Sequence, residues 1–186
     1  VCVCVCVCVC VCVCLSLSFA FFRHLLVDMQ QERDALVKVA LPQLRTLCAQ
    51  RNVFFSEVDL RWGITAEQAE RGEVLGLCLR EIDQCRPYFI SMLGDRYGYV
   101  PAHIPAELRA QYPFLPNTTR EPNTRSVTEF EVLHAALNDP PSAKHAFFFL
   151  KQDANPAHQD NPKASSALKE RVKSSGLPTD TYANPE

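Results

Sequence analysis

Residues 78–101, CLREIDQCRPYFISMLGDRYGYVP, contain a helix end, a strand and a loop from which the fold can be predicted. PYFISMLG (87–94) is apolar for most of its length, as expected of a strand with both faces covered. GDRYGYVP (94–101) follows as a tight polar loop. The segment 65–85 has a buried stripe at helical spacing, which consists of Val74, Leu77, Cys78, Ile82 and Cys85. A helix followed by a buried strand indicates an α/β fold.

Upstream of this segment, a long helix and a short strand are predicted. Apolar side chains recur three and four residues apart from Asp28, which can act as the N-cap, to about residue 51. Pro42 should kink or split this helix, because proline lacks an N–H and its ring clashes with the preceding turn. NVFFSEVDL (52–60) has the composition of a short buried strand, and Thr65 can cap the helix that follows.

Downstream, a long loop leads to another helix. Residues 96–125 are rich in Pro, Asn and Thr, which indicates a loop with one short helix near 105–111. Ser126, with Glu129 three residues later, forms a capping box ahead of an apolar helical pattern. We therefore expect a helix to begin at Ser126.

A third strand and a final helix complete the pattern. HAFFFLK (145–151) is the strand, and a helix around 164–174 ends at Gly176. Strands that alternate with helices predict a parallel sheet with helices on both faces. The three predicted strands should therefore point in the same direction.

The chain opens with seven Val-Cys pairs, residues 1–14. Strict alternation gives strand geometry, but an uncharged run of this kind also favours cross-β aggregation. Three interpretations remain open: a translated dinucleotide repeat, a membrane segment formed by the uncharged residues 1–22, or a real strand or low-complexity tail. We treat residues 1–18 as a low-complexity segment, artefactual or disordered, and 19–186 as the domain. Because the run offers no capped or charged link to the rest, its deletion is predicted to leave stability unchanged.

Outside that run, the composition is that of an ordinary soluble domain. The chain is 47% hydrophobic, but 20 of its first 22 residues belong to that class, which leaves about 41% for the remainder. Cys48, Cys78 and Cys85 lack zinc-ligand spacing, so we expect no metal and a reducing compartment, by default the cytosol. A net charge of −2 with interspersed signs provides no basic surface for nucleic acid. The absence of a GxxxxGK[ST] motif excludes a P-loop NTPase within this chain.

Four sequence blocks, in this order, resemble a known family. They are DMQQERDALVKVALPQL (28–44), VDLRWGIT (58–65), the segment 78–101 and RSVTEFEVL (125–133). The chain resembles over about residues 28–186 the uncharacterised TIR-like domain that precedes a NACHT-type NTPase module, as in NACHT-WD-repeat proteins. The resemblance implies a flavodoxin/TIR-like parallel sheet, incomplete at both ends here, and a cytosolic signalling or scaffold role. It also implies a first strand just before residue 28, where this chain instead has FFRHLLV (21–27).

Polar side chains follow two of the predicted strands. Asp59, Arg61 and Trp62 lie just past one strand, and Asp95 and Arg96 lie past the next. Open parallel sheets bind ligands at the carboxyl ends of their strands, where an arginine can hold a phosphate and a tryptophan can stack on a base. These residues are our candidate ligand-binding set, and the alternative is that they form ion pairs and turn packing.

Glu129 and Glu131 are the candidate catalytic residues. TIR relatives that cleave NAD use a glutamate in a helix after the third strand, and a carboxylate there can stabilise an oxocarbenium-like centre on ribose. The capping role of Glu129 explains its presence equally well. Catalysis and helix capping therefore remain alternatives at this position.

These patterns predict a cytoplasmic protein-interaction or signalling module at the N-terminus of a larger NACHT-type NTPase or repeat scaffold. Its partners would be other proteins or downstream domains of the same polypeptide, with a nucleotide as a second candidate ligand and no cofactor. One alternative is a TIR-type glycohydrolase that cleaves NAD or another nucleotide. The other is a protein anchored in a membrane through residues 1–22.

Overall fold

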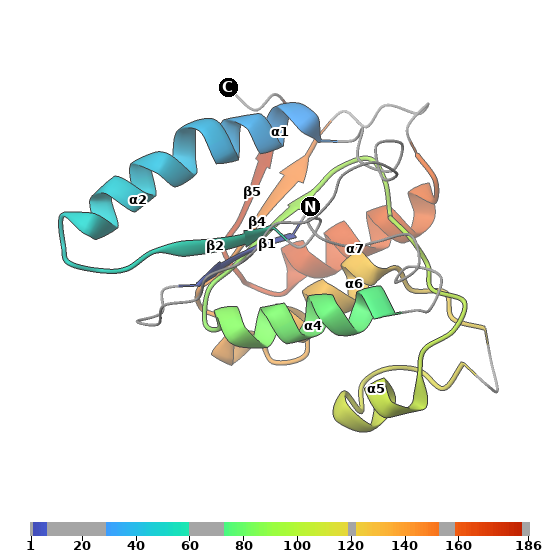
Figure 1. Cartoon of the computed structure of the whole chain (residues 1–186). Coiled ribbons are helices and arrows are strands. Elements are labelled where there is room, and N and C mark those ends of the chain that lie inside the picture. Colours follow the sequence, from blue (N-terminus) through green and yellow to red (C-terminus); the bar gives the residue numbers. More distant parts are fainter. Residues whose placement is uncertain (1, 7–28, 60–72, 119–121, 153–158, 184–186) are drawn as a thin grey trace, which may run out of the picture.

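The structure, a computed structural model, describes residues 2–6, 29–59, 73–118, 122–152 and 159–183, which form a five-stranded sheet with helices on both sides (Figure 1). The strands are β1 (Cys2–Cys6), β2 (Ser56–Asp59), β3 (Phe89–Leu93), β4 (Ala146–Lys151) and β5 (Thr179–Tyr182). The helices are α1 (Gln30–Ala35), the π-helical η2 (Leu36–Ala40), α2 (Leu41–Ala49), α4 (Glu73–Cys85), α5 (Ala106–Gln111), α6 (Val127–Val132), the π-helical η3 (Leu133–Leu137), the 3₁₀ turn η4 (Pro140–Ser142) and α7 (Pro162–Ser174).

The sheet has the strand order β2-β1-β3-β4-β5, which is the order of flavodoxin-like doubly wound sheets. β3, β4 and β5 are parallel, with Ile90 beside Phe147 and Phe149 beside Asp180. β1 is antiparallel to both β2 and β3, so β2 points in the same direction as β3. The expected α/β class is confirmed, and so is the common direction of the three predicted strands.

The start of the Val-Cys run forms β1, which lies between β2 and β3. Val3 pairs with Asp59 on one side and with Ile90 on the other. An alternating sequence has the same face pattern in either direction, so nothing in the run itself selects a parallel orientation. The expected parallel order is therefore interrupted at β1. The segment 21–27, where the resemblance implies a first strand, lies outside the described residues.

Pro42 does not split the first helix, but a π-helical turn stands directly before the helical segment that contains it. α1 continues into η2 and then α2, which has Pro42 in its first turn. In a regular α-helix, Pro42 would leave the carbonyl of Lys38 without its N–H donor and its ring would clash with that carbonyl. The wider π turn before Pro42 accommodates this clash without ending the helix.

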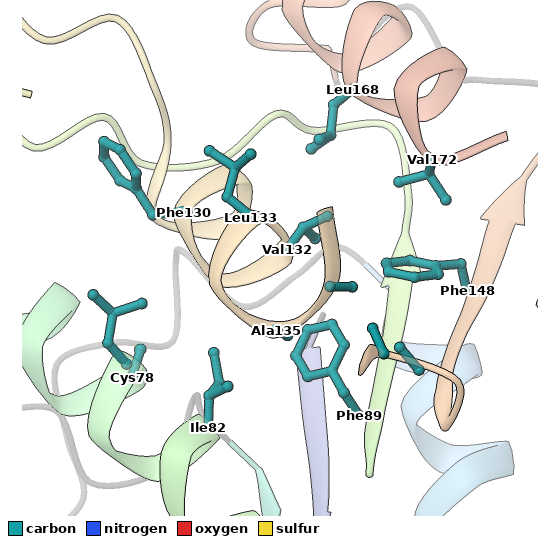
Figure 2. Packing of buried hydrophobic residues seen from close by; sticks show 14 of the residues in the cluster. Cys78, Ile82, Phe89, Phe130, Val132, Leu133, Ala135, Phe148, Leu168 and Val172 are labelled. Atoms are coloured by element: carbon teal, nitrogen blue, oxygen red, sulfur yellow. The ribbon is translucent and has the colours of Figure 1, made fainter. Parts of the chain in front are cut away.

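One face of the sheet carries the main hydrophobic core. α4, α6 and α7 lie on this face, and Figure 2 shows their side chains around Phe89 of β3 and Phe148 of β4. The two phenylalanine rings meet edge to face, with centroids 6.1 Å apart. The labelled helix side chains are Cys78, Ile82, Phe130, Val132, Leu133, Ala135, Leu168 and Val172. Phe148 is fully buried at 0% exposure and lies at the centre of this core.

The opposite face has a much smaller core. α1, η2 and α2 lie over it (Figure 1), and Leu41 and Phe55 are buried there against Ile90. Side chains of β4 alternate between the two faces, so Phe147 and Phe149 point to this side. They are 39% and 37% exposed. β4 therefore presents two phenylalanines at the surface.

Most local predictions agree with the structure. α5 lies within its expected range, and α7 begins two residues before its expected range of 164–174 and ends with it. Gly176, with φ 75°, follows the end of α7. The first part of the predicted helix 65–85 lies outside the described residues, which resume at Glu73. β5 was not predicted, because its sequence TDTY is short and polar and only its pairing with β4 defines it as a strand. Among the helices of the described ranges, none is long and apolar enough to cross a membrane.

Candidate functional site

Asp160 fixes the loop that follows β3. Its Oδ1 accepts hydrogen bonds from the N–H of Tyr97 at 2.6 Å and of Asn161 at 2.8 Å. Its Oδ2 accepts from the N–H of Gly98 at 3.1 Å, and the guanidinium of Arg96 lies 3.9 Å away. Hydrogen bonds to a carboxylate are stronger than neutral ones, so the loop is held firmly against the start of α7.

Gly98 allows this loop to approach α6. Its φ is 101°, and a Cβ at this position would lie 3.2 Å from Thr128 Oγ1. We expect Gly98→Ala to lower the free energy of unfolding by about 1–3 kcal/mol, because an L side chain is strained here. Gly176 also has a positive φ but nothing within 4 Å, so Gly176→Ala should cost only about 1 kcal/mol. Urea denaturation of both variants tests this, and equal losses would contradict the close contact with Thr128.

Glu129 links the β3 loop to α6 and α7. Its N–H donates to Ser126 Oγ at 3.1 Å, which is the predicted N-cap bond. Its carboxylate does not return a bond to Ser126. Oε1 lies 2.8 Å from Arg171 Nη1 and 3.5 Å from Arg125 Nε, and Oε2 accepts from the Tyr97 hydroxyl. Only one of the two hydrogen bonds of the predicted capping box is therefore present, the one from the Glu129 N–H to Ser126. The Glu129 side chain instead connects α6 to α7 and to the β3 loop.

The buried Tyr97 makes stability depend on alkaline pH. Burial and the hydrogen bond to Glu129 raise the pKa of Tyr97 from 10.0 to about 12. The protonated phenol therefore contributes its full stabilisation below pH 10.0, and this contribution is lost as the pH rises towards 12. We expect the free energy of unfolding to fall over this range, and to fall less steeply in Tyr97→Phe.

A matched variant is available for the alkaline titration. Burial and the hydrogen bond to Asp83 likewise raise the pKa of Tyr112 to about 12, so Tyr112→Phe should also reduce the slope. Denaturation at several alkaline pH values measures both slopes. A Tyr97→Phe curve that runs parallel to the wild-type curve would contradict the role of this phenol.

Asp95 is buried in the same loop. Its side chain is 3% exposed, and its Oδ1 has no hydrogen-bond partner in the described structure. A buried carboxylate oxygen without a donor is costly, and such groups are rare in folded proteins. Asp95 therefore differs from Asp160 and Glu129, whose oxygens all have partners.

The structure brings together part of the predicted site. Asp95, Arg96 and Glu129 lie around Tyr97 and Asp160 at the carboxyl end of β3. Asp59 ends β2, with its side chain undescribed, and Arg61 and Trp62 lie outside the described residues. Glu131 is buried in α6.

Three residues of this site, Arg125, Asp160 and Arg171, were not predicted from the sequence. Arg125 lies four residues before Glu129, a spacing at which opposite charges pair near a helix start, so it could have been predicted. Asp160 and Arg171 are 63 and 42 residues away from their partners Tyr97 and Glu129, and no local pattern connects them. Only the fold brings these side chains to the β3 loop.

A second polar cluster surrounds Asp83. His134 Nε2 lies 2.6 Å from Asp83 Oδ1, and the Tyr112 hydroxyl donates to Oδ2 at 2.8 Å. Burial lowers the pKa of His134, although the hydrogen bond to Asp83 and its charge oppose this. Burial tends to raise the pKa of Asp83, but the hydrogen bonds from Tyr112 and His134 outweigh it and lower that pKa. This cluster joins α4 to the segment after α5 and to η3.

Within the part of the chain that the structure describes, no group of three or more His, Cys, Asp or Glu side chains is arranged to hold a metal ion.

The sheet order and the loops at its carboxyl edge define an α/β domain of flavodoxin-like strand order. Residues 26–186 match the family described as a domain of unknown function, DUF4062. The chain therefore belongs to the DUF4062 family. No solved structure is significantly similar to it.

Several curated proteins share this domain. Telomerase protein component 1 of Mus musculus is 36% identical over 129 residues, 68% of this chain and 5% of the relative. Tetratricopeptide repeat protein 41 of Rattus norvegicus is 31% identical over 158 residues, 67% of this chain and 12% of the relative. NACHT domain- and WD repeat-containing protein 1 of Mus musculus is 40% identical over 78 residues, 39% of this chain and 5% of the relative. The chain thus spans a small part of the length of these relatives.

Proposed function

We propose that this chain is a protein-interaction module of a longer polypeptide that carries an NTPase domain, a repeat array or both. The supporting observation is that the matched relatives are named for NACHT, WD-repeat and tetratricopeptide modules, while this chain covers only 5–12% of their length. Repeat arrays bind other proteins through extended surfaces. A domain joined to such arrays acts as a signalling or scaffold element.

The environment of Glu129 supports binding over catalysis. A carboxylate that stabilises a developing charge on ribose must face the substrate. Both oxygens of Glu129 are already engaged, Oε1 by Arg171 and Arg125 and Oε2 by Tyr97. A TIR-type glycohydrolase that uses Glu129 would have to break these contacts, so we place this alternative second.

The exposed phenylalanines of β4 supply a surface for the rest of such a polypeptide. Phe147 and Phe149 lie side by side on one face, and apolar patches of this kind mark interaction sites. β5 is the parallel neighbour of β4 and ends at Tyr182, which pairs with Lys151, so a chain that continues from β5 leaves the sheet two residues beyond Phe149. We propose the segment that follows β5 in a longer polypeptide as the occupant of this face.

The relation to TIR domains and the cellular compartment are further parts of the proposal. The strand order supports a TIR-like flavodoxin topology. Cys48, Cys78 and Cys85 form no disulfide bonds, which supports a reducing compartment such as the cytoplasm. A membrane anchor in residues 1–22 falls almost wholly outside the described residues and stays an alternative.

Transcript sequencing beyond the codon for Glu186 tests the proposal. We expect an open frame that encodes an NTPase domain or a repeat array, whereas a stop codon directly after Glu186 would contradict it. The segment encoded there should bind the purified chain in trans. Phe149→Asp should weaken that binding, while the distant surface variant Asp139→Asn should leave it unchanged.

A further inference from the structure

Asp95 lies at the place where this type of sheet binds ligands. The chain passes from β2 through α4 across β1 to β3, and from there it moves outward to β4 and β5. β2 lies on one side of β1 and β3 on the other, so the switch point of this strand order lies between β1 and β3. In open α/β sheets, ligands bind outside the carboxyl ends of the strands at such a switch point. Asp95 is the second residue after β3.

The lack of a partner for Asp95 is unusual among its neighbours. Asp160 accepts three backbone hydrogen bonds, and Glu129 has partners on both oxygens. Asp95, although 3% exposed, has no hydrogen-bond partner for Oδ1. A buried acceptor that the fold leaves unsatisfied points to a donor on a bound molecule.

Positive charge is available next to the loop that carries this carboxylate. Arg125 and Arg171 share the single oxygen Oε1 of Glu129, so the group of three side chains keeps one net positive charge. Both arginine side chains are about half exposed and have further N–H groups free to donate. Tyr97 donates to the same glutamate, which places the two arginines next to the loop that carries Asp95. Paired guanidinium groups are well suited to bind phosphate.

We infer that the carboxyl end of β3 binds a small phosphorylated sugar. Asp95 accepts hydrogen bonds from the sugar hydroxyls, and Arg125 and Arg171 bind the phosphate. A cationic ligand would suit Asp95 but would be repelled by these arginines and by Arg96, whereas a neutral hydroxyl donates without adding positive charge. Such binding is independent of whether the domain is joined to a longer polypeptide.

Calorimetry and thermal melting of the purified chain with ribose 5-phosphate test this inference. We expect saturable binding and a raised Tm, with ribose alone and inorganic phosphate alone binding at least about tenfold more weakly. Adenosine 5′-monophosphate carries the same ribose phosphate. If adenosine 5′-monophosphate binds more tightly than ribose 5-phosphate, the natural ligand is a nucleotide. If it binds more weakly, the natural ligand is a free sugar phosphate.

Two variants separate a binding role of Asp95 from a structural one. Asp95→Asn keeps the shape but removes the buried charge, so it should raise the Tm of the unliganded chain and weaken ribose 5-phosphate binding by about tenfold or more. Arg125→Gln should weaken binding of ribose 5-phosphate and leave that of ribose unchanged. Asp139→Asn, at an exposed position after η3, should change neither quantity.

Three results would overturn the inference. The first is no saturable binding of ribose 5-phosphate up to about 10 mM. The second is unchanged binding in Asp95→Asn. The third is a lowered Tm of unliganded Asp95→Asn, which would show that the carboxylate stabilises the fold itself.

Discussion

Replacing Phe148 with alanine is expected to lower the free energy of unfolding by about 3–5 kcal/mol, the largest effect of any single substitution considered for this chain. The side chain is 0% exposed and is surrounded by residues from α4, α6 and α7 (Figure 2). Its removal leaves a cavity that the packed helices cannot fill by collapse. Urea denaturation monitored by circular dichroism measures the loss.

The neighbouring residue Phe147 is the matched control for this substitution. It has the same side chain on the same strand, but it points to the other face and is 39% exposed. Phe147→Ala should therefore cost about 1 kcal/mol or less, since most large losses require a buried site. Equal losses in the two variants would contradict the assignment of the main core to the α4, α6 and α7 face.

Glu129→Ala is expected to have the second largest effect. It removes the carboxylate that accepts from Tyr97 and pairs with Arg171 at 2.8 Å. Breaking a buried ion pair typically costs about 3–5 kcal/mol, but the arginine partners are half exposed and water replaces part of the interaction. We therefore expect a loss of about 2–3 kcal/mol in the free energy of unfolding.

Glu170→Ala is the control for Glu129→Ala. Glu170 pairs with Lys173 at the same distance of 2.8 Å, but its side chain is 70% exposed. A surface pair of this kind contributes less than about 0.5 kcal/mol. Thermal or chemical denaturation of both variants compares the two sites. A loss in Glu129→Ala no larger than that in Glu170→Ala would show that Glu129 does not hold these elements together.

Periodic segments could be predicted from the sequence because burial leaves a local pattern. The apolar run of β3 is of this kind and lies where it was predicted. In the predicted stripe of α4, Cys78, Ile82 and Cys85 are buried, whereas Val74 and Leu77 are half-buried. Leu75 and Leu79 are buried there instead. β5 has no such pattern, because TDTY is a strand only through its pairing with β4. The orientation of β1 was also beyond prediction, since Val-Cys alternation is the same in both directions.

Residues of the candidate site could be predicted only where they directly follow a predicted strand or begin a predicted helix. Asp95 and Arg96 were predicted to bind a ligand because ligands bind at the carboxyl ends of parallel strands. Glu129 was singled out because it lies in the first turn of a predicted helix. The partners of Glu129 could not be inferred in the same way, because Arg171 comes from α7 and Tyr97 from the β3 loop.

The structure argues against one expectation about the N-terminal run. β1 pairs through its backbone with both β2 and β3, so deletion of residues 1–18 would remove these hydrogen bonds, whereas the sequence predicted no loss of stability.

Nicotinamide release from NAD tests most directly whether this domain binds or cleaves. The purified chain and its Glu129→Gln variant are incubated with NAD, and nicotinamide is quantified by chromatography against a protein-free sample. Because Arg171, Arg125 and Tyr97 already engage the Glu129 carboxylate, we expect no release above the protein-free level from either protein. Release by the wild type that disappears in Glu129→Gln would contradict the interaction module and identify a glycohydrolase.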